Sequence, residues 1–163
     1  MSLPMSRKFN LYLGKAGQLT IMSEFLARGW NVAMPEVDVG DDIFVVEDKT
    51  GIFYRIQVKT ATAVERQKMG FSAQFRLSVQ QIEVPISPEI YFVFIARFNQ
   101  KWTNSLVISR ETLWNFVQQH KIGSIFNDNL MLYFSFQNDK ATCSNIDFSE
   151  FLNNFDDFPI IEH

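Results

Sequence analysis

Two neighbouring segments constrain the fold of this chain most. Residues 43–46 (Ile-Phe-Val-Val) form a short apolar run, a turn-forming stretch follows at 48–51, and residues 53–60 then alternate between two kinds of side chain. A short apolar run is typical of a buried strand, and a period of two is typical of a strand with two different faces. We therefore expect two antiparallel strands that pair across the 48–51 turn.

The segments around this pair predict the remaining elements. Apolar residues recur with helical spacing over 13–28, at Leu19, Ile21, Met22, Phe25 and Leu26, and Gly29 is expected to end this helix in a left-handed conformation. A short strand at 30–34 and a turn at 35–40 complete a helix and a three-stranded meander. Further strands are expected at 71–77, 90–98, 105–108 and 130–136, and further helices at 111–120, capped by Ser109, and at 148–155. The predicted class is α/β, a mixed β-sheet flanked by helices.

Length and composition indicate one water-soluble domain over residues 1–163. The chain is 47% hydrophobic and 20% charged, which provides an apolar interior and excludes disordered and fibrous classes. The single cysteine, Cys143, cannot form an internal disulfide, so we expect a reducing compartment. No apolar run approaches the roughly 20 residues that cross a bilayer, and no signal peptide is evident. We expect a cytoplasmic protein that has no membrane partner.

The charge of the chain is unevenly distributed. The net charge is −3, but residues 1–80 hold ten Lys/Arg against eight Asp/Glu, whereas the Phe-rich residues 81–163 hold five against ten. A polyanion such as nucleic acid is therefore expected to contact the first half. The candidate phosphate contacts lie around the strand at 53–60: Arg55, Arg66, Lys68 and Arg76. Scattered basic residues also serve solubility alone, and that alternative stays open.

A set of polar residues is expected to share one end of the strand pair. Asp42 stands at the head of one strand, and Gln57 and Lys59 alternate on one face of the other. A carboxylate and an amide oxygen can hold Mg²⁺, and a neighbouring amine can orient or deprotonate a water, which is the chemistry of phosphodiester hydrolysis. Asp38 and Asp41 precede Asp42 and are equally suited to be turn residues.

This pattern, from Gly17 to Thr60, resembles the PD-(D/E)XK nuclease superfamily, which has the restriction-endonuclease-like fold. In that family a helix precedes a three-stranded meander, the second strand begins with a metal-binding Asp, and the third carries (Asp/Glu/Gln)-X-Lys. Asp42 looks like the first position and Gln57-Val58-Lys59 like the second. The resemblance implies a motif core at about 13–60, a Mg²⁺ (or Mn²⁺) cofactor held by Asp42 and Gln57, and DNA as the substrate.

The same family often carries a glutamate on the first helix, where this chain has Gln18. At about 100° per residue, Gln18 lies within the apolar stripe of the helix, whereas Glu24 faces solvent. We therefore expect Gln18 to support the metal ligands, with Asp38 as a second supporting residue. Amides at 18 and 57 in place of carboxylates predict weaker Mg²⁺ binding.

Three functions remain open on the sequence. The first is a Mg²⁺-dependent endodeoxyribonuclease in which Asp42, Gln57 and Lys59 act on the scissile phosphate. The second is a catalytically impaired nucleic-acid-binding module of the same fold, and the third is a protein-interaction domain with no nucleic-acid role. Paired cuts in a duplex would favour a homodimer.

Overall fold

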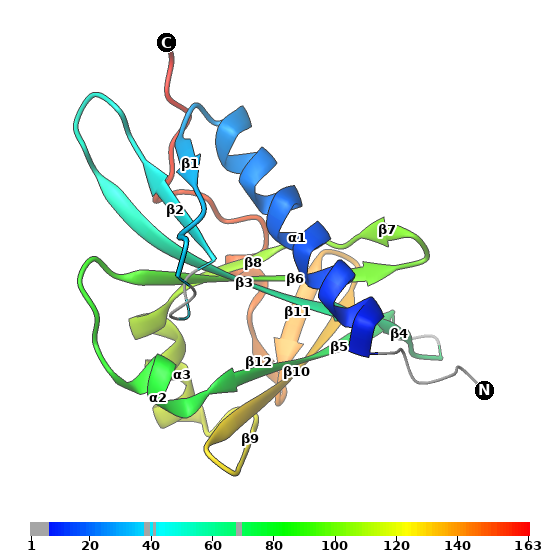
Figure 1. Cartoon of the computed structure of the whole chain (residues 1–163). Helices are drawn as coiled ribbons and strands as arrows, with labels where there is room; N and C mark the ends of the chain where they lie inside the picture. Colours follow the sequence, from blue (N-terminus) through cyan, green and yellow to red (C-terminus); the bar gives the residue numbers. More distant parts are fainter. Residues whose placement is uncertain (1–6, 38–39, 41, 68–69) are drawn as a thin grey trace.

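The computed structural model describes residues 7–37, 40, 42–67 and 70–163. Two β-sheets pack against each other, and helix α1 (Arg7–Ala27) lies across the outer face of the first sheet (Figure 1). The first, sheet A, contains β1 (Asn31–Ala33), β2 (Ile43–Val46), β3 (Phe53–Thr62), β6 (Ile90–Phe98), β7 (Lys101–Trp102) and β8 (Leu106–Ser109). The second, sheet B, contains β4 (Val64–Glu65), β5 (Phe71–Ser78), β9 (Ser124–Phe126), β10 (Asn129–Gln137), β11 (Lys140–Cys143) and β12 (Ile146–Asp147).

Sheet A contains the predicted meander. Strands β1, β2 and β3 are antiparallel neighbours, and β2 pairs with β3 across the expected turn, with Ile43 opposite Ile56. On its other side β3 pairs in parallel with β6, which makes the sheet mixed. The helix, the meander and the mixed sheet confirm the predicted α/β fold class. The second face of the sheet was expected to carry a helix, but it is covered mainly by sheet B, whose strand partners are far apart in the chain.

Helix α1 begins six residues earlier than predicted and buries a narrower stripe. Its buried residues are spaced by four, at Leu13, Gly17, Ile21 and Phe25. Leu19 and Leu26, which were expected in the stripe, are about half exposed (50% and 54%), because at about 100° per residue they lie on the side of the helix opposite the buried stripe. Gly29 ends the helix with φ of +86°, as predicted.

Two apolar layers hold the molecule together. The first lies between α1 and sheet A and includes Phe25, Ile43, Ile56 and Val93. The second lies between the sheets and is rich in phenylalanine, with Phe134 fully buried. Burial of this much apolar surface is the main stabilising contribution to such a fold.

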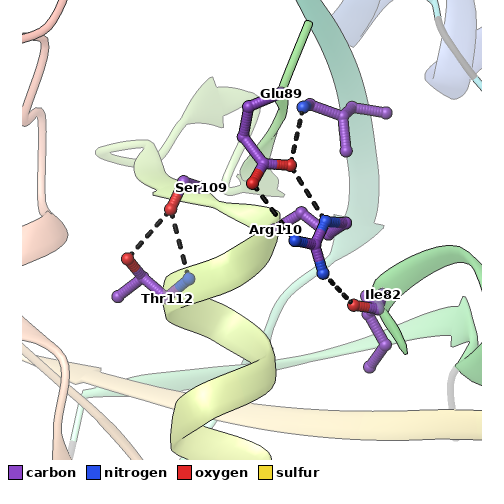
Figure 2. Close-up of polar contacts among 6 residues, drawn as sticks. Ile82, Glu89, Ser109, Arg110 and Thr112 are labelled. Carbon is purple, nitrogen blue, oxygen red and sulfur yellow. Dashed lines mark hydrogen bonds and ion pairs between the residues drawn. The ribbon is translucent and has the colours of Figure 1, made fainter. Parts of the chain in front are cut away.

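The remaining helices are short. Helix α3 (Arg110–His120) has the predicted cap, because the Ser109 hydroxyl accepts a hydrogen bond from the Thr112 N–H at 3.2 Å (Figure 2). The helix expected at 148–155 is wrong, since only the 3₁₀ turn η1 (Ser149–Phe151) forms there. Helix α2 (Val79–Glu83) was not predicted. None of the helices described here is long and apolar enough to cross a membrane.

Candidate active site

Asp42 is held tightly against the middle of β3. Its backbone N–H donates to the Ile56 carbonyl at 2.9 Å, and its Oδ2 accepts the Val58 N–H at 2.7 Å. The ladder between β2 and β3 ends at Ile43, so the carboxylate takes the place of the next backbone acceptor. The local sequence therefore places a carboxylate beside β3 at the point where its pairing with β2 ends.

Gln57 and Lys59 lie on the face of sheet A that looks toward sheet B. Their neighbours in β6 are Phe92 and Phe94, which belong to the layer between the sheets. Val58, by contrast, packs in the layer under α1. Continuing the β2–β3 register by one residue places Asp42 opposite Gln57, on the same face. The backbone thus brings the three predicted residues to adjacent positions, and their convergence around one ion stays a prediction.

The side-chain oxygen of Gln57 is in an unusual environment. Gln57 is only 8% exposed, and its Oε1 is buried without a hydrogen-bond partner among the described residues. A buried polar atom left unpaired costs about 1–3 kcal/mol. Such an oxygen, close to a carboxylate, suits a cation ligand, so these residues fit a divalent metal ion.

The donor set for such an ion is small. In the part of the chain that the structure describes, no group of three Asp, Glu, His or Cys side chains is placed to hold a metal. The candidate therefore consists of one carboxylate, from Asp42, and one amide oxygen, from Gln57. A set with a single charge binds Mg²⁺ more weakly than one with two.

Gln18 positions Asp42 from the other side of the sheet. Its Nε2 donates to the Asp42 carbonyl at 2.7 Å, and its Oε1 accepts from Lys15 Nζ at 3.0 Å. Gln18 is half-buried and turned toward the sheet, as expected, but it contacts the backbone of Asp42. Glu24 is likewise half-buried, and it pairs with Arg28 at 2.9 Å.

A close approach of the helix to β3 makes this contact possible. A Cβ atom on Gly17, the residue before Gln18, would lie 2.1 Å from Thr60 Cγ2. No real side chain tolerates that distance, so glycine is required where α1 meets β3. The sequence showed this glycine only as part of a short Gly-Lys-Ala-Gly stretch, without indicating its contact.

Helix α2 holds the segment that leads into Asp42, a role that the sequence did not suggest. Gln81 Nε2 donates to the Gly40 carbonyl at 2.9 Å, and Gly40 has φ of +104°, a conformation that favours glycine. These two residues are 41 positions apart, and no local pattern relates them.

Arg110 in turn holds α2 in place. Its guanidinium donates to the Ile82 carbonyl at 2.8 Å and binds both carboxylate oxygens of Glu89 at 2.9 and 3.2 Å (Figure 2). Arg110 is 6% exposed, so the pair is partly shielded from water. A five-residue helix is not stable alone, and this contact satisfies a carbonyl at its end. The only sequence signal for these contacts was a charged residue, Arg110, at the start of a predicted helix.

The predicted phosphate contacts do not form one surface. Arg55 is half-buried and belongs to the same strand and face as Gln57. Arg66 is exposed, and its Nε donates to Ser72 Oγ at 2.9 Å. Arg76 alternates with the buried Phe75, so it points to the outer face of sheet B, away from Asp42. Asp38, Asp41 and Lys68 lie outside the described residues.

A hollow lies beside Arg66, beyond the end of β3 that follows Lys59. It has a volume of about 880 Å³ and is lined by Thr60, Thr62, Arg66 and Gln74 among others, but not by Asp42, Gln57 or Lys59. Thr60 follows Lys59 in the chain but faces α1, whereas Lys59 faces sheet B, so the hollow is not part of the candidate site. Among the basic residues named above, Arg66 is the one that lines it.

Comparisons with known proteins add little to this geometry. No family model matches the chain, and no curated protein matches it. Among solved structures, it is similar to a bacterial homing endonuclease, I-Ssp6803I, with 17% sequence identity over 79% of this chain and 76% of that one, and a TM-score of 0.45. A likeness of this size carries no functional argument, so function has to be inferred from the residues of the site.

Proposed function

We propose that this protein is a metal-dependent, nuclease-like protein that hydrolyses DNA phosphodiester bonds. The observation that carries the proposal is the buried Oε1 of Gln57, which has no hydrogen-bond partner in the described part of the chain, at the position opposite Asp42. A buried oxygen left without a donor reduces stability, and binding a cation would offset that cost. The choice of DNA comes from the resemblance of residues 17–60 to the PD-(D/E)XK nucleases.

Each residue has a role in this proposal. Asp42 and Gln57 hold Mg²⁺ or Mn²⁺, and when bound the ion supplies Lewis-acid activation of water and neutralises charge on the phosphate. Lys59, two residues after Gln57 on the same face, orients the attacking water, and in its neutral amine form would accept the proton that the water loses. Gln18 and Gln81 position Asp42 and its preceding segment, without contact to the substrate.

Two arginines are the proposed contacts to the phosphate backbone of the DNA. Arg55 lies two residues before Gln57 on its face, and Arg66 lines the hollow that begins at Thr60. Guanidinium groups bind phosphate oxygens in a forked geometry, so Arg55 near the start of β3 and Arg66 beyond its end are the proposed contacts to a strand that runs along β3.

A second candidate is a nucleic-acid-binding module that has lost catalysis. It is favoured by the single carboxylate of the donor set, because no cluster of three metal-binding side chains exists within the described residues. The two candidates differ in metal affinity, and a titration separates them.

The decisive experiment is calorimetric titration of Mg²⁺ and Mn²⁺ into the wild type, Asp42→Ala and Asp42→Asn. Asp42→Asn retains an oxygen that can accept the Val58 N–H, so it separates loss of charge from loss of folding. We expect saturable binding by the wild type and at least tenfold weaker binding by both variants. Three coinciding titrations would remove the metal site and leave the binding-module candidate.

Lys59 is tested by cleavage of plasmid DNA. Lys59→Ala should suppress cleavage strongly while Mg²⁺ binding and thermal unfolding stay close to wild type, because a half-exposed strand side chain contributes little to stability. Cleavage at the wild-type rate would exclude the proposed role of Lys59 on the water.

A further inference from the structure

A second hollow lies beyond the far end of β6 from Gln57 and shares no lining residue with the candidate active site or with the hollow beside Arg66. Its volume is also about 880 Å³, and it lies between the β6–β7 hairpin of sheet A and the β10–β11 hairpin of sheet B. Phe98 at this end is six residues along β6 from Phe92, the neighbour of Gln57, which is about 20 Å of strand. The hollow is therefore a separate site.

Two tight turns form its rim. Asn99 and Gln100 have φ of 46° and 62°, and Asn138 and Asp139 have φ of 49° and 58°, which is the conformation of two-residue hairpins. Each turn is followed at once by a lysine that lines the hollow, Lys101 in one hairpin and Lys140 in the other. The turns fix the backbone of both lysines at the rim, and the lining holds these two cations against the single carboxylate of Asp139.

The floor of the hollow is aromatic. The Phe71 ring is stacked between those of Phe98 and Phe136, with centroid distances of 4.8 and 5.0 Å and interplanar angles of 17° and 19°. Most other ring pairs in the protein are tilted or edge-on, whereas this stack joins sheet A to sheet B. The stack therefore packs the two sheets together at the floor of the hollow.

Polar groups complete the lining. The side chains of Asn99, Asn104, Gln137 and Asn138 carry amides that both donate and accept hydrogen bonds, and Trp102 lies among them. A lipid or another wholly apolar ligand would leave these amides unpaired. A simple anion would fill only a small part of a volume that suits small organic ligands.

We propose that this hollow binds a nucleotide unit, with its base against the aromatic floor and its phosphate near Lys101 and Lys140. Aromatic rings stack on bases of any sequence, lysines bind phosphate, and amides pair with base edges. The unit could belong to a free nucleotide or to a single strand, and the chemistry of recognition is the same. The site does not depend on the metal site, so it stands or falls separately from the proposed nuclease function.

The test uses the full chain in EDTA, where a nuclease cannot cleave the probe. A labelled ten-residue thymidine oligonucleotide is titrated by fluorescence anisotropy, with thymidine 5′-monophosphate and 2-deoxyribose 5-phosphate as competitors. We expect saturable binding, displacement by the nucleotide, and at least tenfold weaker displacement by the sugar phosphate, which lacks the base. If the mononucleotide competes as well as the oligonucleotide at equal concentration of nucleotide units, the ligand is a free nucleotide. If the oligonucleotide binds much more tightly, the ligand is a single strand.

The variants locate the site. The double variant Lys101→Gln/Lys140→Gln should bind at least tenfold more weakly, whereas Lys49→Gln, an exposed lysine in the β2–β3 turn, should bind like the wild type. No saturable binding, equal competition by the sugar phosphate, or an unchanged double variant would each overturn the proposal.

Discussion

The two ends of the layer between the sheets differ in chemistry. At the β6–β7 end the layer closes with the stacked rings of Phe71, Phe98 and Phe136, and the polar groups stay on the rim. Toward the other end, β3 carries Gln57 and Lys59 on its face toward sheet B. Their neighbours in β6 are Phe92 and Phe94. The apolar end stabilises the fold, whereas the polar end places an unpaired oxygen in the interior, a local conflict that is typical of functional sites.

The largest expected effect comes from the apolar end of this comparison. Phe134→Ala removes a fully buried ring that contacts those of Phe75, Phe94 and Phe148. We expect a loss of about 3–5 kcal/mol in the free energy of unfolding, measured by urea denaturation. A loss below 1 kcal/mol would show that the layer between the sheets is not the main source of stability.

The contact between α1 and β3 is expected to give the next effect. Gly17→Ala would place a Cβ against Thr60 and push the helix, with Gln18, away from Asp42. We expect about 1–3 kcal/mol of destabilisation and weaker Mg²⁺ binding.

The matched control is Gly14→Ala on the same helix. Its Cβ would lie 3.8 Å from Thr60 Oγ1, an ordinary contact. Alanine is favoured over glycine in a helix by up to about 1 kcal/mol, so this variant should be as stable as the wild type or more so. Equal behaviour of the two variants would contradict the close approach at Gly17.

Gln57→Leu tests the polar end directly. It replaces a buried amide, whose Oε1 has no partner among the described residues, with an apolar side chain of similar size, so we expect the protein to gain about 1 kcal/mol in stability while Mg²⁺ affinity falls. Gln57→Glu is the opposite variant, with a second carboxylate, and should bind Mg²⁺ more tightly at lower stability without metal. Urea denaturation and calorimetry measure both quantities, and a Gln57→Leu protein that is less stable than the wild type would show that the amide is satisfied.

The smallest effect is expected for the contact between α2 and Gly40. Gln81→Ala removes one hydrogen bond, worth about 0.5–1.5 kcal/mol, and should weaken Mg²⁺ binding by loosening the segment before Asp42. Gln80→Ala, at an exposed position of the same helix, should change neither property. Identical Mg²⁺ titrations of the two variants would exclude a positioning role for Gln81.

Much of the first sixty residues could be predicted, because their signals are local. The strand pair around 48–51 follows from an apolar run, a turn and an alternating run, and the structure has β2 at the predicted bounds and β3 two residues longer. Gln18 was correctly placed on the inner side of α1, since helical periodicity needs no knowledge of the partner surface. Leu19 and Leu26 were misplaced because they lie on the side of α1 opposite its buried residues, and the contact with the sheet decides which side of the helix is buried.

The sequence by itself determined the register that places Asp42 opposite Gln57, with Lys59 two residues farther along the same face, since a backbone period of two and a short turn leave little choice of register. Only the tertiary structure decided that Gln57 is buried without a partner, that Gln81 and Arg110 support the segment before Asp42, and that two hairpins 39 residues apart enclose a hollow. These features depend on which faces of distant strands meet, and contacts of that kind are set by the packing of the whole domain.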